Sequence, residues 1–211
     1  MIRRVLLLHG LFNPAWWLAT LAGGLRAKGL EAEVFGYPTL GGGPEQAIVR
    51  LQARLRATPV DAIVGHSLGG LVALEALRRM PDAGVARVVC LGSPLRGSAV
   101  AAGLAARGWG AALLGRNAAL LRDGVPAWQG AAAVGVVAGR TPRGMGRLFA
   151  DPGGEHDGTV AVAETRLPGI AAHCVVDASH TGLVVSAAAR RQVLRFLRDG
   201  RFEPAVGSPA V

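Results

Sequence analysis

Residues 61–80 read DAIVGHSLGGLVALEALRRM, and this stretch decides the fold. Residues 62–64, Ala-Ile-Val, form a short apolar run typical of a buried strand, and residues 71–80 follow with helical spacing and stop before Pro81. Between them lies GHSLG at residues 65–69, a G-x-S-x-G sequence. A strand that turns directly into a helix at such a motif predicts a sharp bend, which lifts the Ser67 hydroxyl to the edge of a sheet.

The two glycines of this motif are explained by space. Gly65 and Gly69 lack side chains, so the strand and the helix can approach closely, and Ser67 is forced into a strained backbone conformation. The N–H of Leu68 and the positive end of the helix dipole then point to a place where a negatively charged oxygen is stabilised. Chemistry at Ser67 is the leading hypothesis, and a glycine-rich turn with a solvated serine is the alternative.

The rest of the chain alternates β-rich runs with helical patterns, which indicates βα units and a parallel sheet. Six strands are expected, at residues 3–8, 31–37, 60–64, 85–91, 133–138 and 171–176. Helices are expected at residues 14–28, 44–57, 71–80 and 183–197. The sequence therefore predicts an α/β fold with a doubly wound, mostly parallel six-stranded sheet and helices on both faces.

Residues 1–202 are expected to form one domain, because a chain of 211 residues suffices for one core and is short for two. Residues 94–130 are rich in Ala, Gly and Leu, contain Trp109 and Trp128, and show no clear strand. They are expected to form a small cap or lid over an apolar pocket, with an ordinary crossover helix and loop as the alternative. Residues 203–211 are expected to be a frayed tail.

The formal net charge of +9 comes almost entirely from arginine, since Lys28 is the sole lysine. Four arginines, at positions 190, 191, 195 and 198, cluster on or directly after the last expected helix, but Phe196 is its only aromatic residue. Because a nucleic-acid surface needs aromatic side chains placed for stacking, nucleic-acid binding is not expected. The charge is interpreted as a source of solubility and of mild attraction to anionic surfaces.

Residues 5–25 carry no charge and superficially resemble a signal peptide. His9-Gly10 and Asn13-Pro14 interrupt this run, and its removal would discard the first strand. No other stretch reaches 18 clean apolar residues, so stable membrane insertion is not expected. These observations favour a cytoplasmic protein.

Cys90 and Cys174 lie in strands that are expected to flank a third strand. Two strand spacings would place their Cα atoms roughly 9–10 Å apart, too far for a disulfide, so two free buried thiols are expected. No H-x-x-x-H, C-x-x-C or clustered carboxylates occur at ligand spacing, and no G-x-x-x-x-G-K-[ST] loop is present. The sequence therefore predicts neither a metal nor a cofactor.

Several stretches together resemble one family. The elbow GHSLGG at residues 65–70 is similar to that of lipases and esterases of the α/β-hydrolase superfamily, and the likeness extends to LLLHGL at 6–11, DGTV at 157–160 and SHTG at 179–182. The matches run from residue 5 to residue 200, in the family's order of Ser, then acid, then His. The resemblance implies a serine hydrolase with Ser67 as nucleophile and residues 9–11 in its oxyanion loop.

Five histidines compete for the role of the base that takes the serine proton. His180 is favoured because it follows the last expected strand and lies on the same sheet edge as Ser67, and a histidine in a helix-capping loop is the alternative. The others are set aside: His9 and His66 as structural, His173 as part of a strand, and His156 as the neighbour of the expected acid.

Asp157, Asp151, Glu155 and Asp177 are candidates for the acid that orients the base. Asp177 lies only three residues from His180 and is expected to end a strand. Asp151 precedes Pro-Gly-Gly, a turn composition in which an aspartate usually bonds its own backbone. Asp157 is favoured because a glycine and an apolar residue follow it and because its DGTV stretch resembles the family's acid loop; Asp151 is next.

Backbone N–H groups of Leu11 and Leu68 are expected to form the oxyanion hole, with Phe12 as the alternative to Leu11. Phe12 and Trp16 stand next to the oxyanion loop and are expected to contact the substrate, although Trp16 or Trp17 could equally belong to the core.

These observations predict a serine hydrolase that cleaves carboxylic esters or thioesters of apolar acyl groups through Ser67, His180 and Asp157. The expected partner is a small acyl ester. Two alternatives stay open: an acyltransferase that uses the same three residues, and a catalytically silent binding protein on the same fold.

Overall fold

Six parallel strands form one sheet in the order β2-β1-β3-β4-β5-β6 in the computed structural model, which describes residues 1–39, 41–143 and 153–204. The strands are β1 (Arg4–Leu8), β2 (Glu31–Phe35), β3 (Ala62–His66), β4 (Arg87–Leu91), β5 (Ala133–Gly139) and β6 (Ala172–Val176). Every neighbouring pair runs parallel. The predicted six-stranded sheet is confirmed, and all of its pairs are parallel.

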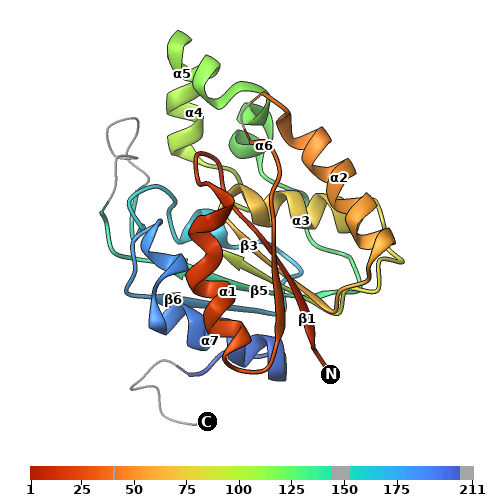
Figure 1. The fold of residues 1–211 in the computed structure, drawn as a ribbon. Helices are drawn as coiled ribbons and strands as arrows, with labels where there is room; N and C mark the ends of the chain where they lie inside the picture. The colour runs from red at the N-terminus through yellow and green to blue at the C-terminus, as the bar shows by residue number, and fades with distance from the viewer. Residues whose placement is uncertain (40, 144–152, 205–211) are drawn as a thin grey trace.

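Helices cover both faces of this sheet (Figure 1), as a doubly wound fold requires. On one face α2 (Gly43–Ala57) and α3 (Leu68–Arg78) pack on the apolar side chains of the central strands. On the other face α1 (Ala19–Arg26) and α7 (Ala187–Asp199) bury a second cluster, whose largest fully buried side chain is Phe196. The central strands are buried on both sides, which explains why they are continuous apolar runs.

Three helices differ in extent from the prediction. The helix expected at 14–28 is split into a short 3₁₀ turn, η1 (Ala15–Leu18), and α1. The helix expected to begin at residue 71 already begins at Leu68, because the bend at Ser67 leads straight into it. The helix expected at 183–197 is preceded by the 3₁₀ turn η5 (Gly182–Val184), and α7 starts after Ser186, whose Oγ accepts a hydrogen bond from the N–H of Ala189 at 3.2 Å.

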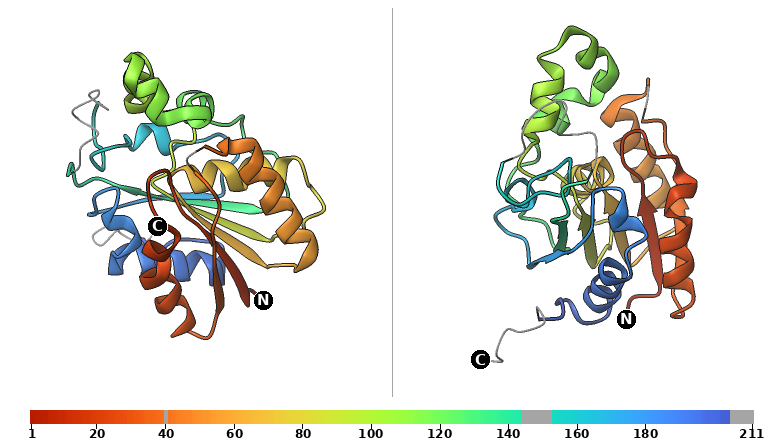
Figure 2. Two further views of the ribbon diagram at one scale, coloured as in Figure 1. Left: turned by 45° about the horizontal axis from the view of Figure 1, so that its top comes forward. Right: turned by 90° about the vertical axis from the view of Figure 1, so that its left-hand side faces the viewer.

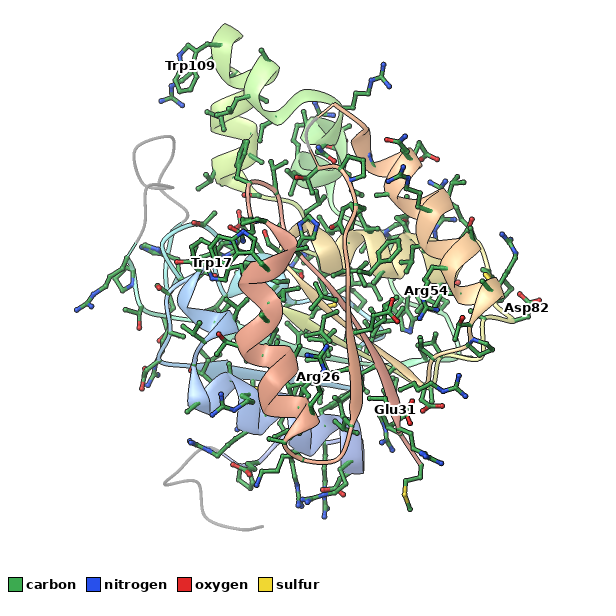
Figure 3. All side chains as sticks on the ribbon, in the orientation of Figure 1. Trp17, Arg26, Glu31, Arg54, Asp82 and Trp109 are labelled. Carbon is green, nitrogen blue, oxygen red and sulfur yellow. The ribbon has the colours of Figure 1, made fainter. Side chains whose placement is uncertain are left out.

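The segment expected to be a cap is largely helical. It contains α4 (Ala99–Ala105), α5 (Gly108–Leu114), a 3₁₀ turn η2 (Gly115–Asn117) and α6 (Ala118–Asp123). Both views of Figure 2 show α4 and α5 standing out from the body above the carboxyl ends of the strands, and Figure 3 places Trp109 at the outer end. The interpretation of Trp128 as part of the cap is wrong: it is buried in the core, and its Nε1–H donates to the carbonyl of Ala132 at 2.8 Å.

Both cysteines are free, as predicted, and β5 separates their strands. Cys90 is buried, whereas Cys174 is only partly buried, because β6 is the last strand in the order of the described sheet. Burial raises the pKa of each thiol to about 12. Neither is therefore a reactive thiolate near neutral pH.

The amino-terminal edge of the sheet carries a cationic hollow of about 790 Å³. Its lining includes Met1, Lys28 and Arg191, with Leu30 and Leu194 as apolar contributors. This hollow lies at the end of the strands opposite to Ser67, which follows the carboxyl end of β3. Within the described part of the chain, no helix is long and apolar enough to cross a membrane.

Candidate active site

Ser67 sits at the bend between β3 and α3 with φ 55° and ψ −122°, a left-handed region that costs free energy for any residue with a side chain. The flanking glycines make the bend possible. A Cβ at Gly65 would lie 2.5 Å from the backbone nitrogen of Gly70, and one at Gly69 would lie 2.5 Å from the carbonyl oxygen of Leu8. The bend is held from the far side by the Ser67 N–H, which donates to the Leu91 carbonyl at 2.9 Å.

Three side chains from distant parts of the sequence meet at this bend. The Nε2 of His180 lies 3.0 Å from the Oγ of Ser67, and its Nδ1 lies 2.8 Å from the Oδ2 of Asp157. Because a carboxylate oxygen only accepts, Nδ1 carries the proton and Nε2 is left free to accept one from the serine. Asp157 is 1% exposed and His180 8%, so water competes little with either contact.

The loop after β5 orients the carboxylate of Asp157 toward the ring of His180. Its Oδ1 accepts hydrogen bonds from the backbone N–H groups of Thr159 at 2.9 Å and Val160 at 2.8 Å, while Oδ2 stays turned to the histidine. The backbone N–H of His180 also donates to the Asp157 carbonyl at 2.9 Å. These bonds to one oxygen satisfy it and fix the direction in which the other points.

Two glycines that the sequence analysis did not single out make room for this pair. Gly92 follows β4 with φ 56°, and a Cβ there would lie 3.1 Å from the Oδ2 of Asp157 and 3.2 Å from the Nδ1 of His180. Gly139 ends β5, and a Cβ there would lie 2.8 Å from the Cβ of Asp157. The sequence signal for these two residues is a glycine directly after an expected strand, in LGS at residues 91–93 and in AGR at residues 138–140.

The loop after β1, residues 9–13, touches the serine from the other side; we call it the β1 loop. A Cβ at Gly10 would lie 2.9 Å from the Cβ of Ser67. The loop is a tight turn closed by the N–H of Asn13, which donates to the carbonyl of Gly10 at 3.4 Å, and it holds Phe12 at φ 60°. Among the described residues, the N–H groups of Leu11 and Phe12 donate to no acceptor.

Contacts between Tyr37 and His9 hold the start of the β1 loop in place. The Tyr37 hydroxyl donates to the His9 carbonyl at 2.5 Å, and the two rings stack at 4.5 Å. His9 Nδ1 donates to the Gly10 carbonyl at 3.1 Å, and its Nε2 accepts from the Tyr37 N–H at 3.4 Å. Burial lowers the pKa of His9 and raises the pKa of Tyr37, so both rings stay neutral in this network.

The remaining histidines lie outside the Ser67–His180–Asp157 chain. The Nδ1 of His156 accepts from the N–H of Gly158 at 3.0 Å. His173 on β6 bonds Thr165 Oγ1 at 2.8 Å, and burial followed by the nearby charge of Arg166 lowers its pKa to about 4. His66 is buried beside His180, with ring centroids 4.9 Å apart.

Two of the other candidate acids pair with Arg140 rather than with His180. Asp177 is exposed and pairs with the Nε of Arg140 at 2.6 Å. Glu155 faces the same arginine, with its Oε1 3.8 Å from Nη1. Asp151 lies outside the described residues.

Two open hollows flank the site. Phe12 lines one of about 450 Å³ together with Tyr37 and Pro38, and Trp16 lines another of about 390 Å³ with Thr181 and Val185, next to His180. Trp16 is 73% exposed and Phe12 48%, whereas Trp17 packs partly on the core, as the alternative interpretation allowed for one of the two tryptophans. No group of three His, Cys, Asp or Glu side chains in the described ranges could hold a metal ion.

Comparisons with known proteins agree with this architecture. The sequence profile described as the alpha/beta hydrolase family matches residues 5–207. Among solved structures, the mature lipase BlEst2 of Bacillus licheniformis superposes with a TM-score of 0.71 at 21% identity, covering 93% of this chain and 91% of that one.

A pyrethroid hydrolase of Sphingobium faniae gives a TM-score of 0.63 at 16% identity, covering 94% of this chain and 98% of that one. Tomato methylketone synthase I, complexed with beta-ketoheptanoate, gives 0.56 at 14% identity and covers 95% and 98%. None of the curated proteins matches significantly. At these identities the superpositions show a shared fold, while the profile spans nearly the whole sequence; the chain belongs to the alpha/beta hydrolase family.

Proposed function

We propose that this hydrolase cleaves carboxylic esters of apolar acyl groups through an acyl-enzyme on Ser67. The observation that carries the proposal is the unbroken hydrogen-bond chain from Ser67 Oγ through His180 to Asp157 Oδ2. A serine hydroxyl is a weak nucleophile until an adjacent base accepts its proton, and the Nε2 of His180 lies within reach for that transfer. Asp157 then stabilises the charged imidazole and keeps its ring in the required tautomer.

In the first half-reaction Ser67 Oγ attacks the acyl carbon as His180 takes its proton. The carbonyl oxygen becomes an oxyanion, which the N–H groups of Leu68 and Leu11 stabilise. Leu68 is the first residue of α3, so its N–H has no acceptor within the helix, and the N–H of Leu11 is free among the described residues. His180 gives the proton to the leaving alcohol, and a water molecule activated by the same histidine releases the acid.

The apolar character of the substrate is supported by what surrounds the serine. Phe12 and Trp16 present large exposed apolar surface in the two hollows beside it. The helical segment from Ala99 to Asp123 stands over the carboxyl ends of the strands, where a cap would cover a bound acyl chain. The presence of a lipase among similar structures also supports an ester substrate.

Labelling by a fluorophosphonate probe tests the nucleophile directly. We expect the purified protein to be labelled and to hydrolyse p-nitrophenyl esters, and Ser67→Ala to do neither. Ser93→Ala is the matched control: its Oγ is buried beside Cys90 and takes no part in the hydrogen bonds that join Ser67, His180 and Asp157, so loss of this hydroxyl leaves the nucleophile intact. Labelling that persists in Ser67→Ala, or a wild type that is inert to the probe and to every ester, would refute the proposal.

A panel of acyl-chain lengths, with oxygen and sulfur leaving groups, separates esters from thioesters. Adding alcohols or amines as competing acceptors tests for acyl transfer. If acylated acceptor rather than free acid is the main product, the protein is an acyltransferase with the same three residues.

A further inference from the structure

His66 joins two loops that the mechanism above uses separately. It is the last residue of β3 and precedes Ser67, and its side chain is 1% exposed. Its Nε2 lies 2.9 Å from the backbone carbonyl oxygen of His180, in the loop after β6 (residues 177–182, the β6 loop). Its Nδ1 lies 3.2 Å from the side-chain nitrogen of Asn13, in the β1 loop.

The two contacts fix one protonation state of the ring. A carbonyl oxygen only accepts hydrogen bonds, so the Nε2 of His66 carries a proton and donates it to His180. The side-chain nitrogen of Asn13 only donates, so the Nδ1 of His66 is bare and accepts. If the His66 ring carried a proton on both nitrogens, its Nδ1–H would face the side-chain nitrogen of Asn13, which also donates, and the hydrogen bond between them would be lost. Burial, followed by repulsion from His180 when that ring is protonated, lowers the pKa of His66 to about 3, so the His66 ring stays neutral near neutral pH.

We propose that His66 is a positioning residue that ties the β1 loop to the β6 loop, so that the oxyanion donors and the base His180 keep a fixed geometry about Ser67. The inference deepens the proposed function and rests on it. The hydroxyl, the base and the free N–H of Leu11 come from three chain segments, and His66 contacts two of them while covalently adjoining Ser67.

The bond to the His180 carbonyl is the more important of the two. The backbone of His180 is held on one side by its N–H bond to Asp157 and on the other by its carbonyl bond to His66. Together these bonds fix the peptide planes on both sides of the residue whose ring must meet Ser67. Without the His66 bond the carbonyl oxygen of His180 is left without a donor from the described residues, and the base shifts out of its place beside Ser67.

Two substitutions separate the two bonds. A glutamine amide nitrogen reaches the place of the imidazole Nε2, so His66→Gln keeps the donor to His180. An asparagine amide oxygen takes the place of Nδ1, so His66→Asn keeps the acceptor for Asn13 and loses that donor. We expect His66→Asn to lower kcat by roughly 10–100-fold, the range that misplacement of a reacting group by about 1 Å produces, with little change in KM. His66→Gln should retain kcat to within about five-fold, the effect of one neutral hydrogen bond.

His173→Asn and His173→Gln are matched controls, because His173 is also hydrogen-bonded and pKa-lowered but lies on β6 away from the serine. Both should keep wild-type kcat. Equal losses in His66→Gln and His66→Asn, or no loss in either, would overturn the proposal. If both His66 variants are misfolded by circular dichroism, Asn13→Ala decides: a fall in kcat of about two- to five-fold at constant KM supports the link, and unchanged kcat overturns it.

Nitrogen-15 NMR of the wild type tests the link without turnover. The ring of His66 should show the neutral tautomer with the proton on Nε2 from about pH 5 to pH 8. A charged ring, or a proton on Nδ1, would overturn the inference even if esters are hydrolysed. A wild type inert to esters and to fluorophosphonate would instead refute the proposed function, and the NMR result would still report on the link.

Discussion

Asp157 holds His180 by two separate hydrogen bonds, one from the ring and one from the backbone. The ring Nδ1 meets Oδ2 at 2.8 Å, and the backbone N–H of His180 meets the carbonyl oxygen of Asp157 at 2.9 Å. The backbone bond brings the two loops together regardless of the side chain at 157. The ring bond alone sets the tautomer of His180. A change of side chain at position 157 can therefore alter the protonation of the histidine ring without separating the two loops.

Asp157→Asn should therefore remove activity and leave the fold in place. An amide can donate to Nδ1 and so stabilise the wrong tautomer, which lowers kcat by roughly 10⁴-fold in the serine protease triad. Ester hydrolysis and thermal unfolding measure the two effects. Asp177→Asn is the control and should keep full activity, because Asp177 is exposed and pairs with Arg140 at the surface. Activity above a few per cent in Asp157→Asn would exclude this aspartate as the orienting acid.

Gly92→Ala should damage both stability and catalysis. A methyl group there would crowd Oδ2 of Asp157 and Nδ1 of His180, and the positive φ adds about 1–2 kcal/mol of strain. Gly84→Ala isolates the backbone effect, since Gly84 has φ 71° and nothing within 4 Å of a built Cβ. Urea unfolding should show a larger loss for Gly92→Ala, and only this variant should lose kcat. Equal losses in both variants would mean that the space beside the pair is not needed.

Acid should destabilise the protein in part through its buried histidines. The pKa of His173 is lowered to about 4 by burial and by the charge of Arg166, whereas the unfolded chain has an ordinary value near 6.5. As pH falls below about 6.5 the unfolded state binds the proton first, so the stability contributed by this group is complete above that pH and declines toward pH 4.

His173→Gln should therefore flatten the fall in unfolding free energy by up to about 1.4 kcal/mol per pH unit across this window. Urea unfolding at several pH values between about 4 and 7, compared with wild type, measures the difference. Parallel curves for the two proteins would show that His173 ionises freely in the folded state.

Phe12→Ala and Trp16→Ala should raise KM for long acyl esters more than for acetates, because each removes exposed apolar surface from a hollow beside the site. Burial of a large side chain against a ligand contributes roughly 1.5–3 kcal/mol, so KM changes of about ten-fold or more are expected for the residue that meets the acyl chain. Val49→Ala is the control, an exposed apolar side chain on α2 away from both hollows. The same KM at every chain length would assign neither residue to the substrate.

The sheet could be predicted because its strands are apolar runs bounded by turn residues, a local signal that survives in the folded structure. Helix ends were harder. The start of the first expected helix is a 3₁₀ turn, and α3 begins three residues early since the serine bend supplies its first turn. Trp128 was assigned to the cap from composition alone, although its side chain reaches back into the core.

Ser67 and His180 carry strong local signals, a motif and a position after the last strand, so sequence alone could nominate them. The places of Gly92, Tyr37 and His66 in the site depend on contacts between segments many residues apart. His66, for example, meets a carbonyl 114 positions away. No local pattern encodes such a contact, and only the folded arrangement reveals it.

The cationic hollow at the amino-terminal edge of the sheet has a practical consequence. Lys28 lines it, and the sequence contains no other lysine, so the lysine amine lies on that one side of the sheet. Dyes, resins or sensor surfaces that react with lysine side chains will therefore couple to the protein in a nearly uniform orientation. The opposite rim, which carries Ser67 at the carboxyl end of β3, will face the solution without any engineered tag to direct it.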